Sequence, residues 1–209
     1  MKPNEIEKLS FSLIDKEAGP HSFTSLEWRV VRRMIHTSAD FDYLQTVRFG
    51  NDPITSSIQA IKKGCVLFTD TEMVKAGIRK KDLEKFGCTI TCYMNDREVA
   101  AMAQSRGTTR ALESVTKAAP DLNGSIYVIG NAPTALLHLI ELIQKGRSAP
   151  TAIIGFPVGF VNAAESKALL EKVNIPYVTN VGRKGGSNIA ASVVNALVLL
   201  AMEQVGTDE

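Results

Sequence analysis

The chain has 209 residues, of which 44% are hydrophobic and 22% are charged, and its formal net charge is +2 at pH 7. This composition is typical of a soluble globular protein, and the small net charge excludes a strongly basic, nucleic-acid-binding chain. The length favours a single domain over residues 1–209, because a chain of this size can bury one sizeable core.

The first long helix is predicted to begin after Thr24. The sequence Thr24-Ser25-Leu26-Glu27 is a capping box, in which the threonine caps the helix and a glutamate three residues later bonds back to the cap. Apolar residues then recur at Leu26, Val30 and Met34, which is the spacing of a helix face that packs against a core.

From residue 64 onward, short apolar runs alternate with helical patterns. The helical patterns begin at capping residues and end at glycine or proline. Near-continuous apolar strands are typical of a parallel sheet that helices cover on both faces. The sequence therefore predicts a three-layer α/β/α domain of the flavodoxin-like kind with a five-stranded parallel sheet. The five predicted strands lie in residues 64–70, 88–94, 125–130, 151–156 and 176–182.

The three cysteines are Cys65, Cys88 and Cys92, and the chain shows no signal-peptide pattern. An odd number of cysteines in such a sequence favours free thiols in a reducing cytoplasm. No histidine is near enough in sequence to complete a familiar zinc pattern, so we expect no metal site. The most apolar stretch, residues 189–202, is shorter than the roughly 20 residues that span a bilayer. We expect it to form a buried helix, with no membrane partner.

In an open sheet of this type, ligands bind beyond the carboxyl ends of the strands. Two segments there are rich in small residues, namely the turn containing Asn131 and the GRKGGS turn containing Arg183. Small residues let backbone approach a ligand, and helix N-termini offer N–H groups to anions. GRKGGS lacks the spacing of a phosphate-binding loop, which disfavours a nucleotide site. Its two cations either hold a carboxylate or belong to a flexible basic turn.

Acid–base chemistry is the catalysis for which the chain has a candidate residue. There is no G-x-S-x-G motif and no cysteine with an evident activating partner, so a nucleophilic triad is unsupported. On a helix, His36 projects to the same side as Arg29, Arg32 and Arg33. This face is either a solvated basic surface, which periodicity alone favours, or an acid beside anion-binding side chains. His138 lies in an apolar helical pattern and is expected to be a packed or partly exposed helix residue.

Five segments of the chain, in this order, carry a family resemblance: RMIHTSADFDY, FTDTEMVKAGI, GNAPTALLHLIE, GFPVGFVNAAESK and GRKGGSNIAASVVNAL. They closely resemble the precorrin-8X methylmutase family of corrin biosynthesis, and the resemblance extends from Ile6 to Met202. It implies an isomerase of cobalamin biosynthesis that moves a methyl group from C-11 to C-12 of precorrin-8X or cobalt-precorrin-8, giving hydrogenobyrinate or cobyrinate. It implies no separate cofactor, although the substrate itself can carry cobalt. HTSADFD and FTDTE are more similar to the cobalt-using branch.

The resemblance also implies roles for particular residues. His36 of the RMIH segment is implied to be the proton donor to the ring nitrogen beside the migrating methyl group. The family is implied to form a homodimer that holds the corrinoid substrate near the subunit interface. One departure is TTRALES, where Leu112 and Glu113 replace smaller residues of the family pattern. The residues expected to contact substrate are Ser10, Thr109 and Arg110, together with Asn131 and Arg183 because they follow strand ends.

A second class of function is compatible with the same segments. A tetrapyrrole-binding or carrier protein could keep this fold and lack the chemistry. The residue that discriminates the two is His36, because binding alone does not require a titrating side chain at that position. A nucleotide-dependent transferase is a third class, and it would require nucleotide binding at the glycine-rich turns.

Overall fold

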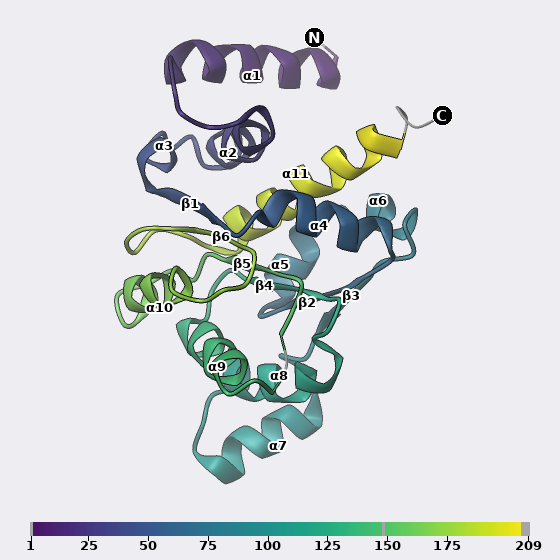
Figure 1. Cartoon of the computed structure of the whole chain (residues 1–209), viewed down its shortest axis with the longest axis vertical. Helices are drawn as coiled ribbons and strands as arrows, with labels where there is room; N and C mark the ends of the chain where they lie inside the picture. The colour runs from purple at the N-terminus through teal and green to yellow at the C-terminus, as the bar shows by residue number, and fades with distance from the viewer. Residues whose placement is uncertain (1, 148, 206–209) are drawn as a thin grey trace.

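The computed structural model describes residues 2–147 and 149–205, and Figure 1 shows a sheet between two layers of helices. Buried side chains form one hydrophobic cluster on each face of the sheet. The first face carries α1 (Pro3–Ala18), α2 (Ser25–Ser38), α3 (Tyr43–Thr46), α4 (Pro53–Lys62), α5 (Glu72–Gly77), α6 (Lys80–Glu84) and α11 (Ser187–Val205). The second face carries α7 (Arg97–Arg106), α8 (Arg110–Ala118), a 3-10 turn (Ala119–Asp121), α9 (Pro133–Gln144) and α10 (Ala163–Leu170).

The sheet has the strand order β1-β6-β5-β4-β2-β3. Strands β2 to β6 are parallel to one another. Numbered in chain order, these five strands have the spatial order 2-1-3-4-5, which is the flavodoxin-like arrangement. The predicted fold class is therefore confirmed. The strands are β1 (Val47–Gly50), β2 (Val66–Thr69), β3 (Thr89–Cys92), β4 (Ile126–Ile129), β5 (Ala152–Gly155) and β6 (Tyr177–Asn180).

Over the described residues the sheet has six strands, one more than predicted. The additional strand, β1, pairs antiparallel with β6 so that Val47 lies opposite Asn180. An antiparallel edge strand on an otherwise parallel sheet is a common arrangement. Strand β1 follows α3 directly, and its sequence VRFG contains an exposed arginine and is not a continuous apolar run, so no periodic pattern marks it. Close packing requires the glycine at its end, since a Cβ atom on Gly50 would lie 2.2 Å from the ring of Tyr177.

The predicted start of α2 is confirmed. The backbone N–H of Glu27 donates to the Thr24 hydroxyl at 3.3 Å, and the Glu27 carboxylate accepts from the Thr24 N–H at 2.8 Å. Val30 and Met34 have no exposed surface, and their side of α2 packs against α11. The cap and the apolar spacing together fix both where this helix begins and which of its sides faces the core.

Helix α11 is the central helix of the first layer. It has 19 residues and by length and composition alone could cross a bilayer, but most of it is buried inside the molecule. It packs against α2, α4 and α5 as well as the sheet. A helix that is apolar on most of its circumference suits this enclosed position. The predicted buried helix over residues 189–202 is confirmed, and it extends beyond both predicted ends.

Candidate active site

The strand order reverses between β2 and β4, and at this point the carboxyl edge of the sheet is filled by a side chain of the protein. The Asp70 carboxylate accepts hydrogen bonds from the backbone N–H groups of Gly130, Asn131 and Ala132 at 2.9, 2.8 and 2.8 Å. These residues lead into α9. Folds of this kind commonly bind a ligand anion at such a helix start. Here Asp70 takes that position itself.

The surroundings of Asp70 are tightly packed. Its side chain is 1% exposed, and burial raises the pKa of the carboxyl group while the three backbone donors oppose that rise. A Cβ atom on Gly130 would lie 2.6 Å from the Cα atom of Ser187, the first residue of α11. The Thr71 and Ser187 hydroxyls are 3.1 Å apart. These contacts close the crevice and leave Asn131 exposed at its rim.

A buried lysine holds the loop of residues 181–186, which joins β6 to α11. The Lys167 ammonium group donates to Oδ1 of Asn180 at 3.1 Å and to the carbonyl oxygen of Lys184 at 2.6 Å. Lys167 has no exposed surface, and burial lowers its pKa to about 8. Only one feature of the sequence marks this residue: helical spacing places it on the same side of α10 as Ala163 and Leu170, which are buried.

The same loop is also fastened to the end of α2. The Lys184 ammonium group lies 2.6 Å from a carboxylate oxygen of Asp40 and 2.6 Å from one of Asp42. These hydrogen-bonded ion pairs lower the pKa of Asp40 and raise that of Lys184. The backbone N–H of Asp40 in turn donates to the hydroxyl of Ser38, the last residue of α2. The loop of residues 181–186 therefore links α10 to the helix that carries His36.

His36 lies in the last turn of α2 and faces α1. Its ring packs against the ring of Phe11 with a centroid separation of 5.1 Å, and the side chain stays exposed. Among the residues that the structure describes, its ring nitrogens have no hydrogen-bond partner. Ser10 precedes Phe11 on α1, and its hydroxyl donates to the carbonyl oxygen of Ile6 at 2.8 Å. The packing of α1 on α2 thus places Ser10 and His36 on one helix pair.

The arginines beside His36 are engaged in ion pairs. Their partners are acidic residues on α1 and α11, so the pairs fasten those two helices to α2. Neither sequence-based alternative, a solvated basic face or a set of free anion-binding side chains, describes them. Their partners could not be identified from the local sequence because they lie on other helices. The pairs are Arg29 with Glu203, Arg32 with Asp15 at 2.9 Å and Arg33 with Glu7 at 3.1 Å.

A hollow lies between α2, α5 and α11, close to the turn that carries His36. Its volume is about 220 Å³, and its lining includes Arg33, Thr37, Gly77 and Asn188. Pockets for drug-sized ligands have volumes of about 300–1,000 Å³. A tetrapyrrole with peripheral carboxylates needs a site at the upper end of that range, so this hollow in one chain is too small to enclose it.

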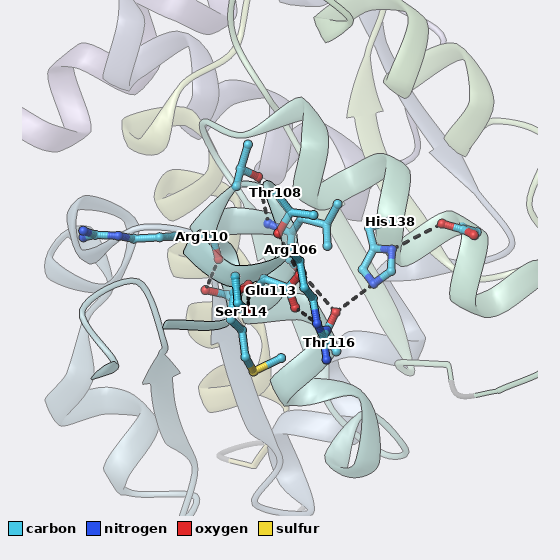
Figure 2. Close-up of polar contacts among 12 residues, drawn as sticks. Arg106, Thr108, Arg110, Glu113, Ser114, Thr116 and His138 are labelled. Carbon is cyan, nitrogen blue, oxygen red and sulfur yellow. Dashed lines mark hydrogen bonds and ion pairs between the residues drawn. The ribbon is translucent and has the colours of Figure 1, made fainter. Parts of the chain in front are cut away.

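Thr109 and Arg110 begin α8 on the opposite face of the sheet. The Thr109 hydroxyl accepts from the backbone N–H of Leu112 at 3.2 Å and lies 3.1 Å from the hydroxyl of Thr134 in α9. Figure 2 shows Arg110 extending away from α8; it is exposed and has no ion-pair partner among the described residues. Because Thr134 follows the Asn131 turn, the structure brings Thr109 and Arg110 to the same part of the carboxyl edge as Asn131.

Arg183 lies in the loop of residues 181–186, which follows β6. The guanidinium of Arg183 lies over the ring of Phe160, 5.5 Å from its centroid, and Phe160 is 84% exposed. His138, also seen in Figure 2, is a partly exposed helix residue as predicted, with Nε2 2.9 Å from the Thr116 hydroxyl. Over residues 2–147 and 149–205, no group of three or more His, Cys, Asp or Glu side chains is placed to hold a metal ion.

The candidate residues thus form two groups on opposite faces of the sheet. In Figure 1, α1 and α2 lie at one end of the longest axis of the molecule, and α7 and α8 lie at the other. Ser10 and His36 belong to the first end, whereas Thr109 and Arg110 belong to the second. A single chain therefore does not bring the proposed acid together with the proposed carboxylate-binding arginine.

Comparison with known proteins gives one consistent result. A sequence model of the precorrin-8X methylmutase family matches residues 5–200. The chain is 47% identical to a cobalt-precorrin-8 methylmutase of Leptospira interrogans, with 95% of this chain and 94% of that protein aligned. It is 45% identical to a cobalt-precorrin-8 methylmutase of Priestia megaterium, with 96% and 89% aligned.

A solved structure gives the same result for the fold. The crystal structure of a precorrin-8X methylmutase from Thermus thermophilus superimposes with a TM-score of 0.89 and 40% sequence identity, over 96% of this chain and 97% of that one. Identity at this level over nearly the whole length extends well beyond a shared architecture. The chain therefore belongs to the precorrin-8X methylmutase family and is an isomerase of cobalamin biosynthesis.

Proposed function

We propose that the enzyme moves a methyl group from C-11 to C-12 of its corrinoid substrate in the cytoplasm, with His36 as the proton donor. The observation that carries this proposal is the environment of His36. Its ring is held by Phe11 and is exposed, and its nitrogens have no hydrogen-bond partner among the described residues. A general acid needs a proton that is positioned for the substrate and not committed to the protein.

The chemical role of His36 is limited to one proton. Protonation of the pyrrole-ring nitrogen beside C-11 draws electron density from the ring and eases the passage of the methyl group to C-12. Substrate and product are isomers, so the donated proton is balanced by one that returns, and the proposal requires no separate cofactor. A well-placed acid of this kind contributes a factor of about 10² to 10⁴ in rate.

The other candidate residues suit binding of the carboxylates at the corrinoid periphery. Arg110 offers a guanidinium that has no ion-pair partner within residues 2–147 and 149–205 and can hold a carboxylate through two parallel hydrogen bonds. Thr109 and Asn131 provide a hydroxyl and an amide at the same edge, and Arg183 provides a second cation. Ser10, on the helix that packs against His36, would contact the substrate near the reacting ring.

The separation of these residues supports a homodimer. The macrocycle can meet His36 and Arg110 together only if a second copy supplies one of them. Helix α1 presents an outward stripe of Ile6, Leu9 and Leu13, which are 52%, 49% and 58% exposed. Exposed apolar side chains at helical spacing are typical of a protein–protein interface. The proposed site therefore lies between α1 and α2 of one chain and the carboxyl edge of the other.

The proposed substrate carries cobalt. Both curated relatives described above are named for cobalt-precorrin-8. The metal is then part of the substrate, and the protein need only accommodate it. Absorption spectra of the protein with cobalt-bearing and with metal-free precorrin-8 will test this point, and a preference for the metal-free compound in both affinity and turnover will contradict it.

The acid role is tested by His36→Ala. We expect this variant to bind the corrinoid product with near-native affinity, while kcat falls about 10²- to 10⁴-fold. His21→Ala is the matched control, because His21 lies in a loop and stacks on Trp28. A tetrapyrrole carrier without chemistry would give no turnover even in the unchanged protein. An undiminished rate in His36→Ala would contradict the acid role.

A further inference from the structure

The turn that precedes Arg110 is held by a buried carboxylate. Glu113 of α8 is 1% exposed, and both of its carboxylate oxygens have partners. One oxygen accepts from the Thr108 hydroxyl at 2.7 Å, and the other accepts from the Arg106 guanidinium at 2.9 Å. Figure 2 shows the three side chains together around the turn between α7 and α8. Glu113 therefore fixes the segment that delivers Thr109 and Arg110 to the carboxyl edge.

Arg110 is placed where it could pair with the same carboxylate. It precedes Glu113 by three residues on α8, and side chains at this spacing are neighbours on a helix. In the structure it points away from Glu113 and stays exposed, while Arg106 at the end of α7 pairs with Glu113 in its place. Arg106 has 54% of its side chain exposed, so the pair is buried only on the carboxylate side.

This arrangement has a consequence for Arg110. A buried carboxylate is strongly unfavourable without a charged or hydrogen-bonding partner. If Arg106 is removed, Glu113 keeps the Thr108 hydroxyl but loses its cation, and Arg110 is the nearest arginine on its own helix. We propose that Glu113 and Arg106 form a positioning pair, in which Arg106 neutralises Glu113 and so keeps Arg110 free for a substrate carboxylate. The inference rests on the proposed binding role of Arg110.

The proposal is tested with three variants: Arg106→Met, Glu113→Gln and the double variant. Arg106→Met is expected to raise KM about tenfold with little change in kcat, because Arg110 is drawn to Glu113 and away from the substrate. Adding Glu113→Gln removes the charge that attracts Arg110, so the double variant is expected to recover most of the lost affinity. Arg97→Met, at the other end of α7, controls for the loss of one arginine.

A purely structural pair gives a different pattern. In that case each single substitution lowers the melting temperature, the double variant loses less than the sum because the two residues are in contact, and the double variant binds no better than Arg106→Met. Either this result or an unchanged KM in Arg106→Met overturns the proposal. A crystal structure of Arg106→Met gives a readout without substrate, in which we expect the Arg110 guanidinium within ion-pair distance of Glu113. If Arg110→Ala binds substrate with unchanged affinity, only the carboxylate-binding role of Arg110 is refuted. The position of Arg110 in the crystal structure of Arg106→Met still decides whether Arg106 keeps Arg110 away from Glu113.

Discussion

The ammonium group of Lys167 and the carbonyl oxygen of Lys184 are joined by a hydrogen bond of 2.6 Å. Lys184 in turn uses its own side chain to hold Asp40 and Asp42. A buried residue of α10 thus determines the course of the loop from β6 to α11, and that loop fastens the carboxyl end of α2. Arg183 lies in this loop, and His36 lies in the last turn of α2, to which the loop is fastened.

Removal of the buried ammonium group is expected to change how stability depends on pH. The pKa of Lys167 is lowered from 10.5 to about 8, so above about pH 8 the unfolded chain holds a proton that the folded chain has released. The free energy of unfolding therefore gains a contribution that rises with pH up to about 10.5. Lys167→Met is expected to lack this rise in urea titrations at about pH 7.5 and about pH 9.5. The exposed Lys172→Met is the control, and an identical pH dependence in Lys167→Met and the unchanged protein would show the assignment to be wrong.

The pair between Lys184 and Asp40 is expected to weaken in acid. Its hydrogen bond lowers the pKa of Asp40 below 3.8, so the folded chain holds this proton less readily than the unfolded chain. The stabilisation is complete above about pH 5 and is lost as the pH falls through the lowered pKa. Asp40→Asn should therefore reduce the melting temperature at neutral pH, with a difference that shrinks in acid. Asp121→Asn, an exposed aspartate elsewhere, should show no such convergence.

Asp70 is expected to be required as a carboxylate. An asparagine at this position presents an NH₂ group where one oxygen now accepts, so at least one of the three N–H donors of Gly130, Asn131 and Ala132 loses its acceptor. A buried donor without a partner costs about 1–3 kcal/mol. Chemical denaturation of Asp70→Asn should show a loss of about 2 kcal/mol. A stability equal to that of the unchanged protein would mean that the carboxylate does not organise this turn.

The shared site is tested by mixing two impaired variants and measuring activity at substrate concentrations below KM. His36→Ala lacks the proposed acid, and Arg110→Ala lacks the proposed carboxylate-binding arginine. If each site takes His36 from one chain and Arg110 from the other, a mixed dimer contains one site with both residues intact. Co-expressed variants with different affinity tags should then regain a substantial part of the activity that each variant has lost alone. No recovery in a purified mixed dimer would place both residues of each site in the same chain.

Several features of the protein follow from neighbouring residues alone. The capping box at Thr24 and the alternation of apolar runs with helical patterns are local, so the sequence predicts the parallel sheet and its helices. The five family segments are contiguous stretches, so they also carry the family assignment. Strand β1 is different, because it has no continuous apolar run and its partner β6 is far away in the chain.

The tertiary structure decided the polar contacts, because their partners are distant in sequence. Arg29 pairs with Glu203 across 174 residues, and the Lys184 ammonium group reaches Asp40 across 144. No periodic pattern connects such residues. The burial of Lys167 and Asp70, the lack of an ion-pair partner for Arg110 in the described part of the chain, and the separation of His36 from Arg110 depend on how the layers pack. The sequence by itself therefore determined the family and the order of the elements, whereas only the folded chain shows which charges are neutralised within it and which remain available to a ligand.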